Sequence, residues 1–429
     1  MKLLVIGAGG REHALAWKLA CSPRISRVFV APGNAGTARE DGLVNVPITA
    51  PPELIDFAQK EGVAFTVVGP EAPLAEGVVD AFQAAGLKIF GPKQSAARLE
   101  SSKEYAKSFM ARYGIPTAQY AVFEAAAPAH AYLEEHRAPI VIKADGLAAG
   151  KGVVVAMSAD EAHSAVDLML TERRLGASGS RIVIEEYLDG EEASFIALCD
   201  GRHALPLATS QDHKRLLDGD CGPNTGGMGA YSPAPVVTPT VHAKAMREVI
   251  QPALSGMQRE GTPYVGFLYA GLMISRDGTL RVLEFNCRMG DPETQPIIMR
   301  LKSDLVGMIE HALAGTLDRA EAEWDTRVAL GVVLAAHGYP EAPRKGDAIR
   351  GLPAPQDDYH IFHAGTALRD HDVLTNGGRV LCVTALGDSV AEAQARAYTV
   401  CARISWNRAF YRRDIGYRAI ARENAGGRG

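Results

Sequence analysis

Short apolar runs alternate with amphipathic segments along the first hundred residues of the chain. Each run is about as long as one strand, and the segments between them repeat apolar residues at the spacing of a helix face. Strands that alternate with helices predict a parallel sheet covered by helices on both faces, with ligands at the carboxyl ends of the strands. The expected strands are residues 3–6, 27–30, 65–68 and 88–90, and the expected helices are residues 11–21, 53–61 and 75–85.

Beyond residue 101 the alternation gives way to strands joined by glycine-rich loops. A helix over residues 106–113 ends at residues 114–116, Gly-Ile-Pro. Residues 267–275 and 280–286 predict a hairpin that turns at Asp277–Gly278. Further strands are expected at 140–143, 152–157, 181–185 and 193–199, helices at 159–170 and 239–258, and a glycine-rich loop at 219–235.

The chain of 429 residues is long enough for two to four domains. The tail has its own strands at 328–335 and 380–385 and a helix at 389–404, which predicts a small α+β domain. We therefore expect an N-terminal α/β domain at 1–101, a central domain at 102–323 with a lid lobe at about 118–190, and a C-terminal α+β domain at 324–429.

Composition excludes several classes of protein. The net charge of −5 and pI near 6.2 argue against a nucleic-acid partner, because neutralising phosphates needs a basic surface. No apolar run is long enough to span a membrane, and the opening residues do not resemble a signal peptide. The six cysteines are too scattered for a zinc or redox motif, so we expect free thiols and a cytoplasmic protein.

A glycine turn follows the first strand, in the sequence Gly7-Ala8-Gly9-Gly10-Arg11-Glu12-His13. It is a poor dinucleotide motif, because Glu12 stands where the third glycine is required and the second strand ends without an acid. Free amides at a helix N-terminus would still suit a phosphate or a carboxylate. A turn needed only for packing is the alternative.

Two lysines and several glycines lie between strands in residues 140–153, IVIKADGLAAGKGV. This is not a Walker loop, because no Ser or Thr follows Lys151 and a strand stands where a helix would be needed. Glycines allow the backbone to approach phosphate oxygens and lysines neutralise them. The segment therefore predicts a lid over a triphosphate held between sheets.

Acidic residues end the strand in residues 182–194, IVIEEYLDGEEAS. An extended backbone can bind the edge of adenine while a nearby carboxylate accepts the ribose hydroxyls. Acidic strand ends are also common on solvated surfaces, so this segment alone does not decide between the two interpretations.

Glu284, Asn286 and Arg288 are spaced two apart in residues 282–293, VLEFNCRMGDPE. Alternate residues of a strand face the same way, so the first two present two oxygen ligands suited to Mg²⁺. Arg288 continues the row and could hold a phosphate or a carboxylate. A buried polar row without a ligand is the alternative.

Amide, hydroxyl and glycine backbone donors are concentrated in residues 208–215, ATSQDHKR, and residues 222–231, GPNTGGMGAY. Such donors suit a sugar phosphate. His213 could move a proton, but a single histidine is more often a structural hydrogen-bonding residue, and we favour that role.

Taken in order, these segments resemble the ATP-grasp superfamily and, within it, the phosphoribosylamine–glycine ligase (glycinamide ribonucleotide synthetase) family of purine biosynthesis. The resemblance covers about the first 300 residues. The matching strings are GAGGREHA, PGNAGT, VGPEAPL, IKADGLAAGKGV, IEEYLDGEEAS, SQDHKR, GPNTGGMGAYSP and LEFNCRMGDPETQ.

This resemblance implies a parallel α/β pre-ATP-grasp domain, a two-lobed ATP-grasp fold and a small C-terminal α+β domain. It also implies that ATP activates glycine as glycyl phosphate, which 5-phosphoribosylamine then attacks. The implied partners are these small molecules, with neither nucleic acid nor membrane, in a monomer or weak homodimer. Chemistry of this kind needs positioning and charge neutralisation more than a protein nucleophile.

Residue roles follow from the same resemblance. Residues implied at the nucleotide are Lys103, Lys143, Gly146, Gly150, Lys151, Gly152, Glu185, Tyr187, Leu188 and Glu192. Glu284 and Asn286 would ligate Mg²⁺ or Mn²⁺, and Lys143, Asp212 and Arg288 would be catalytic. Those implied at the substrates are Gly9, Gly10, Arg11, Asp212, His213, Lys214, Asn224, Thr225, Gly226, Gly227, Met228, Arg288, Gly290 and Asp291.

One departure from the superfamily concerns the metal. Many members carry another carboxylate on the strand before the Glu-x-Asn pair, but residues 267–274 contain no acid, so a two-metal cage is in doubt. Three alternatives remain open at this point: another ATP-grasp ligase or carboxylase of nucleotide metabolism, a nucleotide-binding regulator without activity, and an NAD-dependent dehydrogenase.

Overall fold

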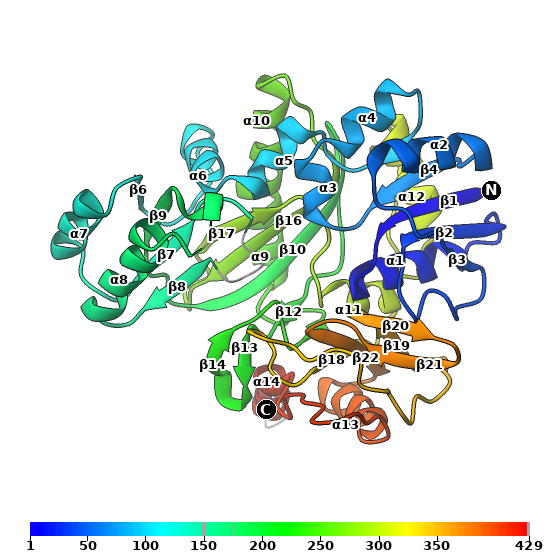
Figure 1. Ribbon diagram of the computed structural model, residues 1–429. Coiled ribbons are helices and arrows are strands. Elements are labelled where there is room, and N and C mark those ends of the chain that lie inside the picture. The colour runs from blue at the N-terminus through cyan, green and yellow to red at the C-terminus, as the bar shows by residue number, and fades with distance from the viewer. Residues whose placement is uncertain (148–151, 175, 427–429) are drawn as a thin grey trace.

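The computed structural model describes residues 1–147, 152–174 and 176–426. The N-terminal unit is the expected parallel sheet, with strand order β3-β2-β1-β4-β5 and helices on both faces (Figure 1). Its strands are β1 (Lys2–Gly7), β2 (Arg27–Pro32), β3 (Leu43–Asn45), β4 (Phe65–Val68) and β5 (Ile89–Phe90), and its helices are α1 (Gly10–Ala20), α2 (Pro51–Glu61), α3 (Glu71–Ala75), α4 (Val78–Ala84) and α5 (Gln94–Ser101).

The helix expected at residues 75–85 is divided into α3 and α4. Gly77 separates them with φ +87°, a left-handed conformation that ends one helix before the next begins. Glu71 begins α3, just after β4, and its carboxylate pairs with Arg288.

Two antiparallel sheets form the central unit. The larger has strand order β11-β10-β16-β17, and the predicted hairpin is β16 (Val265–Ile274) with β17 (Leu280–Asn286). The sheet also includes β10 (Glu191–Asp200) and β11 (Ala204–Pro206), and it is accompanied by α6 (Lys103–Arg112), α9 (Pro239–Ala245), α10 (Gln251–Arg259), α11 (Thr294–Arg300) and α12 (Leu305–Ala314).

The second central sheet is a lobe with its own small core. Its strand order is β6-β9-β7-β8, and two helices cover one face, at the left of Figure 1. The elements are β6 (Tyr120–Phe123), α7 (Ala126–Glu135), β7 (Ile140–Ala144), β8 (Val153–Ala156), α8 (Ala159–Val166) and β9 (Ile182–Glu186). A separate core suits a lobe that moves as one body against the rest.

The C-terminal sheet recruits strands from the middle of the chain. Its order is β12-β15-β18-β22-β19, and β15 (Gly229–Ser232) pairs antiparallel with β18 (Val328–Ala335). Residues 219–235, expected as a loop, therefore contain β15 and most of a small hairpin. The other elements are β12 (Gln211–Asp212), β13 (Arg215–Leu217), β14 (Cys221–Asn224), β19 (Tyr359–His363), β20 (Thr366–Arg369), β21 (Asp372–Thr375), β22 (Arg379–Gly387), α13 (Val390–Cys401) and α14 (Tyr417–Gly426).

The domain division at residues 101 and 323 stays a prediction, since one sheet takes strands from both sides of the second boundary. In the part of the chain that the structure describes, no helix is long and apolar enough to cross a membrane.

Buried histidines join the N-terminal unit to the C-terminal sheet. His13 Nε2 lies 3.2 Å from Glu40 Oε2, and His360 Nε2 lies 3.3 Å from the same oxygen. The backbone N–H of His363 donates to His13 Nδ1 at 2.9 Å. Burial lowers the pKa of both His13 and His363, so this interface is built for neutral imidazoles.

Acidification is expected to destabilise the protein through these groups. A histidine whose folded pKa is lowered gives stability that is present above its unfolded pKa, near 6.5, and is lost as pH falls. Each one that stays neutral in the folded state would cost about 2 kcal/mol at pH 5. Urea unfolding at pH 7 and pH 5 measures the loss. His363→Asn should reduce it, and the exposed His371→Asn should not; equal losses in all three proteins would contradict the assignment.

Candidate active site

A cavity of about 450 Å³ lies between the two central sheets and reaches the N-terminal unit. Residues from β7, β9, β12 and β17 line it together. Of the residues expected in the site, it is lined by Arg11, Lys103, Lys143, Gly146, Gly152, Glu185, Tyr187, Leu188, Glu192, Asp212, Lys214, Asn224, Thr225, Gly226, Glu284, Asn286, Arg288 and Asp291. Residues far apart in the chain thus meet in one space large enough for a small ligand.

The cavity lining among the described residues does not include the other expected residues. Gly9 lines a neighbouring cavity, and Gly150 and Lys151 lie outside the described residues. The cavity between the two central sheets, called the main cavity below, is not lined by Gly10, His213, Gly227, Met228 or Gly290.

Two lysines share one buried carboxylate at the lobe end of the cavity. Lys143 Nζ lies 3.0 Å from Glu185 Oε1, and Lys107 Nζ lies 2.8 Å from Glu185 Oε2. Lys143 also donates to the carbonyl of Leu283 at 3.1 Å, which ties the lobe to β17. Burial lowers the pKa of Lys107 to about 8, despite the carboxylate beside it. Glu185 therefore holds the Lys143 ammonium in the lining of the cavity, where it could bind an anion.

Lys103 begins α6 and points at the loop after β7. Ser102 caps the helix by accepting from the N–H of Tyr105, while the N–H of Lys103 donates to Asp145 Oδ1 at 2.6 Å. Lys103 Nζ donates to the carbonyl of Gly146 at 2.8 Å. Because Asp145 and Gly146 lie at the start of the segment predicted to form a lid, α6 fixes the point from which that segment begins.

Glu284 and Asn286 lie side by side on β17, as their spacing predicts. Asn286 Nδ2 lies 3.4 Å from Glu284 Oε1. Burial alone would raise the pKa of Glu284, but Lys214, Lys143 and Lys103 bring it down to about 2. The carboxylate is therefore ionised, and with the amide oxygen it offers a divalent cation two hard ligands.

The partner of Glu284 on β16 is Gly271, and β16 contains no acidic residue. Within residues 1–147, 152–174 and 176–426, no three His, Cys, Asp or Glu side chains are grouped so as to hold a metal ion. The pair on β17 fits a cation only when ligand oxygens complete its coordination, as the phosphates of ATP would.

Arg288 is held by protein oxygens in this structure. Its Nε lies 3.2 Å from Glu71 Oε2, and its Nη2 lies 2.7 Å from Glu100 Oε1. Nη2 also donates to Asn286 Oδ1 at 3.2 Å, and Nη1 donates to the carbonyl of Met289. Arg288 thus links Asn286, one of the two expected metal ligands, to acids of the N-terminal unit, and its direct contact with phosphate or glycine stays a prediction.

The polar loop after β12 divides its side chains between two environments. Asp212 and Lys214 line the cavity, where burial raises the pKa of Asp212 and Lys214 pairs with Glu192. His213 faces away and accepts from the N–H of Gly416 at 2.9 Å. The structure therefore favours the structural role of His213 over the substrate contact also expected for it.

The N-terminal turn binds a carboxylate of its own chain. The N–H of Gly9 donates to Glu12 Oε2 at 2.6 Å, and Arg11 Nε donates to Glu12 Oε1 at 2.6 Å. A side chain at Gly7 or Gly69 would collide with Glu12. The residue that broke the dinucleotide pattern thus occupies the amide that was expected to be free for a ligand.

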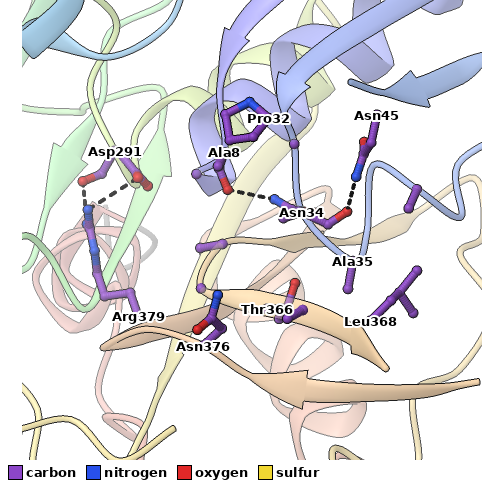
Figure 2. A pocket seen from close by; sticks show the side chains of 16 residues that line it. Ala8, Pro32, Asn34, Ala35, Asn45, Asp291, Thr366, Leu368, Asn376 and Arg379 are labelled. Atoms are coloured by element: carbon purple, nitrogen blue, oxygen red, sulfur yellow. Dashed lines mark hydrogen bonds and ion pairs between the residues drawn. The ribbon is translucent and has the colours of Figure 1, made fainter. Parts of the chain in front are cut away.

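A second cavity, of about 620 Å³, lies between the N-terminal turn and the C-terminal sheet (Figure 2). Asn34 lines it but is used by the fold, because it donates to the carbonyls of Ala8 and His363 and accepts from the N–H groups of Gly36 and Thr37. Asp291 and Arg379, paired at the left of Figure 2, line both cavities.

Sequence reasoning missed several residues that line the main cavity. Glu71 and Glu293 lie inside the quoted strings VGPEAPL and RMGDPETQ, but neither was given a role. Lys107 lies one helical turn after Lys103, a spacing that could have indicated it. Arg379 belongs to no motif, and only the folded chain brings it to the site.

Comparison with known proteins gives the chain a consistent set of relatives. Family models of phosphoribosylglycinamide synthetase match as the N domain over residues 1–100, the ATP-grasp (A) domain over 101–294 and the C domain over 329–418. A phosphoribosylamine–glycine ligase of Ralstonia nicotianae is 63% identical over 98% of this chain and 100% of the relative. One of Escherichia coli O157:H7 is 62% identical over 99% of this chain and 100% of the relative.

Solved structures agree with this grouping. The crystal structure of phosphoribosylamine–glycine ligase from Thermotoga maritima has a TM-score of 0.83 and 37% identity, covering 97% of this chain and 100% of that one. Biotin carboxylase from Campylobacter jejuni has a TM-score of 0.75 at 13% identity, covering 96% of this chain and 92% of that one, and so shares the fold alone.

Proposed function

The chain belongs to the phosphoribosylglycinamide synthetase family, and from that membership we infer that it joins glycine to 5-phosphoribosylamine with conversion of ATP to ADP and phosphate. The observation that carries this inference is identity of 63% to a phosphoribosylamine–glycine ligase over almost the whole chain. The cavity supports it, since it combines lysines for phosphates with an ionised Glu284.

We propose that ATP lies along β7, β9 and β17. Lys143, held by Glu185, and Lys103 would neutralise the phosphates, and the loop over residues 146–152 would close on them and exclude water. The backbone at Glu185, Tyr187 and Leu188 would bind adenine, and Glu192 the ribose once it parts from Lys214. Mg²⁺ or Mn²⁺ held by Glu284 and Asn286 would supply charge stabilisation between the phosphates.

The chemistry then needs two displacements. A carboxylate oxygen of glycine attacks the γ-phosphorus of ATP and releases ADP, which gives glycyl phosphate. The amino group of phosphoribosylamine attacks the glycyl carbonyl carbon, loses a proton and expels phosphate. We propose that Arg288 and Asp212 position glycine in these steps, and that Lys214 and the loop over residues 224–229 face the ribosylamine phosphate.

Location and assembly are also proposals. Six free cysteines, with no pairing between them, support a reducing compartment such as the cytoplasm. We propose a monomer or weak homodimer that works on small molecules without a nucleic-acid or membrane partner.

Steady-state release of ADP tests the function. We expect release that requires glycine and phosphoribosylamine together, with neither substrate sufficient alone. Release supported by bicarbonate in place of glycine would instead indicate an ATP-grasp carboxylase and contradict the proposal. ATP binding without turnover under any of these conditions would favour a regulator.

A further inference from the structure

Two side chains from the C-terminal part of the chain hydrogen-bond to the backbone of Gly226, which lines the active-site cavity. The N–H of Gly226 donates to Tyr339 Oη at 3.0 Å, and the carbonyl of Gly226 accepts from Arg379 Nη1 at 2.6 Å. Both polar atoms of a loop residue are thus fixed by side chains that lie more than a hundred positions later in the chain.

The same guanidinium reaches a second loop. Arg379 Nη1 donates to the carbonyl of Asp291 at 2.5 Å, and Nη2 lies 3.2 Å from Asp291 Oδ2. Figure 2 shows this pair beside the second cavity, and both residues also line the main one. Arg379 therefore ties the loop that contains Gly226 to the loop that follows the metal pair.

The loop that contains Gly226 also includes Asn224 and Thr225, which line the same cavity. The N–H and hydroxyl of Thr225 both donate to the carbonyl of Lys214, at 2.7 and 2.8 Å, and the N–H of Gly227 donates to the Thr225 hydroxyl. Residues 224–226 are held at one end by the backbone of Lys214 and at the other by Arg379. Loss of either anchor would change where their donors point.

A side chain at position 226 would displace the guanidinium of Arg379. A Cβ placed there would lie 2.9 Å from Arg379 Cζ, closer than such atoms approach in proteins. The guanidinium of Arg379 thus packs against the backbone of Gly226 to which it donates, so a substitution at either position would affect the other.

We propose that Arg379 is a positioning residue for the phosphorylated amine substrate, acting through the loop of residues 224–227 and Asp291. This inference rests on the proposed function, which places the ribosylamine phosphate at that loop. The partners of Arg379 among the described residues are Gly226 and Asp291, on the substrate side, whereas Lys143 and Glu185 pair with each other on the nucleotide side. Its loss should therefore weaken one substrate and spare the other two.

Kinetics of Arg379→Ala test this separation. We expect the KM for phosphoribosylamine to rise about tenfold or more, as for a lost charge-assisted hydrogen bond, with the KM values for ATP and glycine within about twofold of the parent. Arg379→Lys should recover part of the loss. Arg350→Ala is the matched control, because this arginine of the same unit pairs with Asp372 on the exposed surface.

A double-mutant cycle with Gly226 provides a second measurement. Gly226→Ala alone should raise the same KM by displacing the guanidinium, but it should add little to Arg379→Ala, where nothing remains to collide with. Tyr339→Phe keeps the ring, loses only the hydroxyl contact to Gly226, and should raise this KM slightly.

Two results would overturn the proposal: an unchanged KM for phosphoribosylamine, or an equal loss for all three substrates. If Arg379→Ala does not fold, the Gly226→Ala and Tyr339→Phe variants test the proposal in its place. A raised KM for phosphoribosylamine alone in both variants would support it, and unchanged values would overturn it. Failure of the parent enzyme to turn over glycine would instead refute the proposed function.

Discussion

Glu284→Gln is expected to lower kcat by about 1,000-fold, or ~4 kcal/mol of transition-state stabilisation. The substitution keeps the shape of the side chain and removes its charge. Because Gly271 stands opposite on β16, no acid of that strand can replace the lost ligand. The γ-phosphate would then accept the glycine oxygen without the cation held in place beside it.

Two measurements separate this effect from general damage. Mn²⁺ titration followed by electron paramagnetic resonance should show weaker binding in the presence of ADP, while thermal unfolding stays close to that of the parent. Glu248→Gln, at a partly exposed side chain that pairs with its neighbour Arg247 outside the cavity, is the matched control. Turnover of Glu284→Gln near the parent rate would show that the metal is bound elsewhere.

Arg412→Met is expected to destabilise the C-terminal unit by about 3 kcal/mol, since it breaks a buried ion-pair network. The Arg412 side chain is 0% exposed. Its guanidinium binds both carboxylate oxygens of Asp414 at 2.8 Å, Asp220 Oδ1 at 2.9 Å and the carbonyl of Arg215 at 3.1 Å. Two carboxylates and one carbonyl would each lose a donor, although Asp220 would keep its contacts with Tyr417 and Arg418.

Urea unfolding monitored by circular dichroism would measure the loss. Arg413→Met is the control, because this neighbouring arginine is exposed. We expect Arg413→Met to stay within about 0.5 kcal/mol of the parent, as is usual for surface substitutions. An equal, small effect of both substitutions would show that the network around Arg412 contributes little.

Local patterns were enough to predict the elements whose partners are near in sequence. The parallel N-terminal sheet, the hairpin of β16 and β17, and the shared face of Glu284 and Asn286 all follow from spacing within a few residues. The family resemblance added the fold and the reaction, and both are confirmed.

Features that depend on distant contacts were not predictable in this way. β15 looked like loop because it follows a glycine-rich stretch and its four residues carry no strand pattern, and it becomes a strand by pairing with β12 and β18. Glu12 filled the glycine turn because its side chain folds back, which a motif does not show. Arg379 stands at the start of an ordinary strand, and its role appears only when Gly226 is placed against it.

The C-terminal sheet, which pairs β15 with the much later strand β18, has a consequence for synthesis on the ribosome. β15 ends at residue 232, and its neighbour β18 begins at residue 328, so until β18 emerges the nascent chain can pair β15 with the two-residue strand β12 but not with β18. The N-terminal unit can assemble early, because its five strands are contiguous in sequence. The loops that contain Gly226 and Asp291, by contrast, gain their contacts with Arg379 late, when β22 is made. A chain that stops before β22 would therefore contain the lobe of β6, β7, β8 and β9 but would lack Arg379 beside the loop of residues 224–227. We expect such a fragment to be inactive.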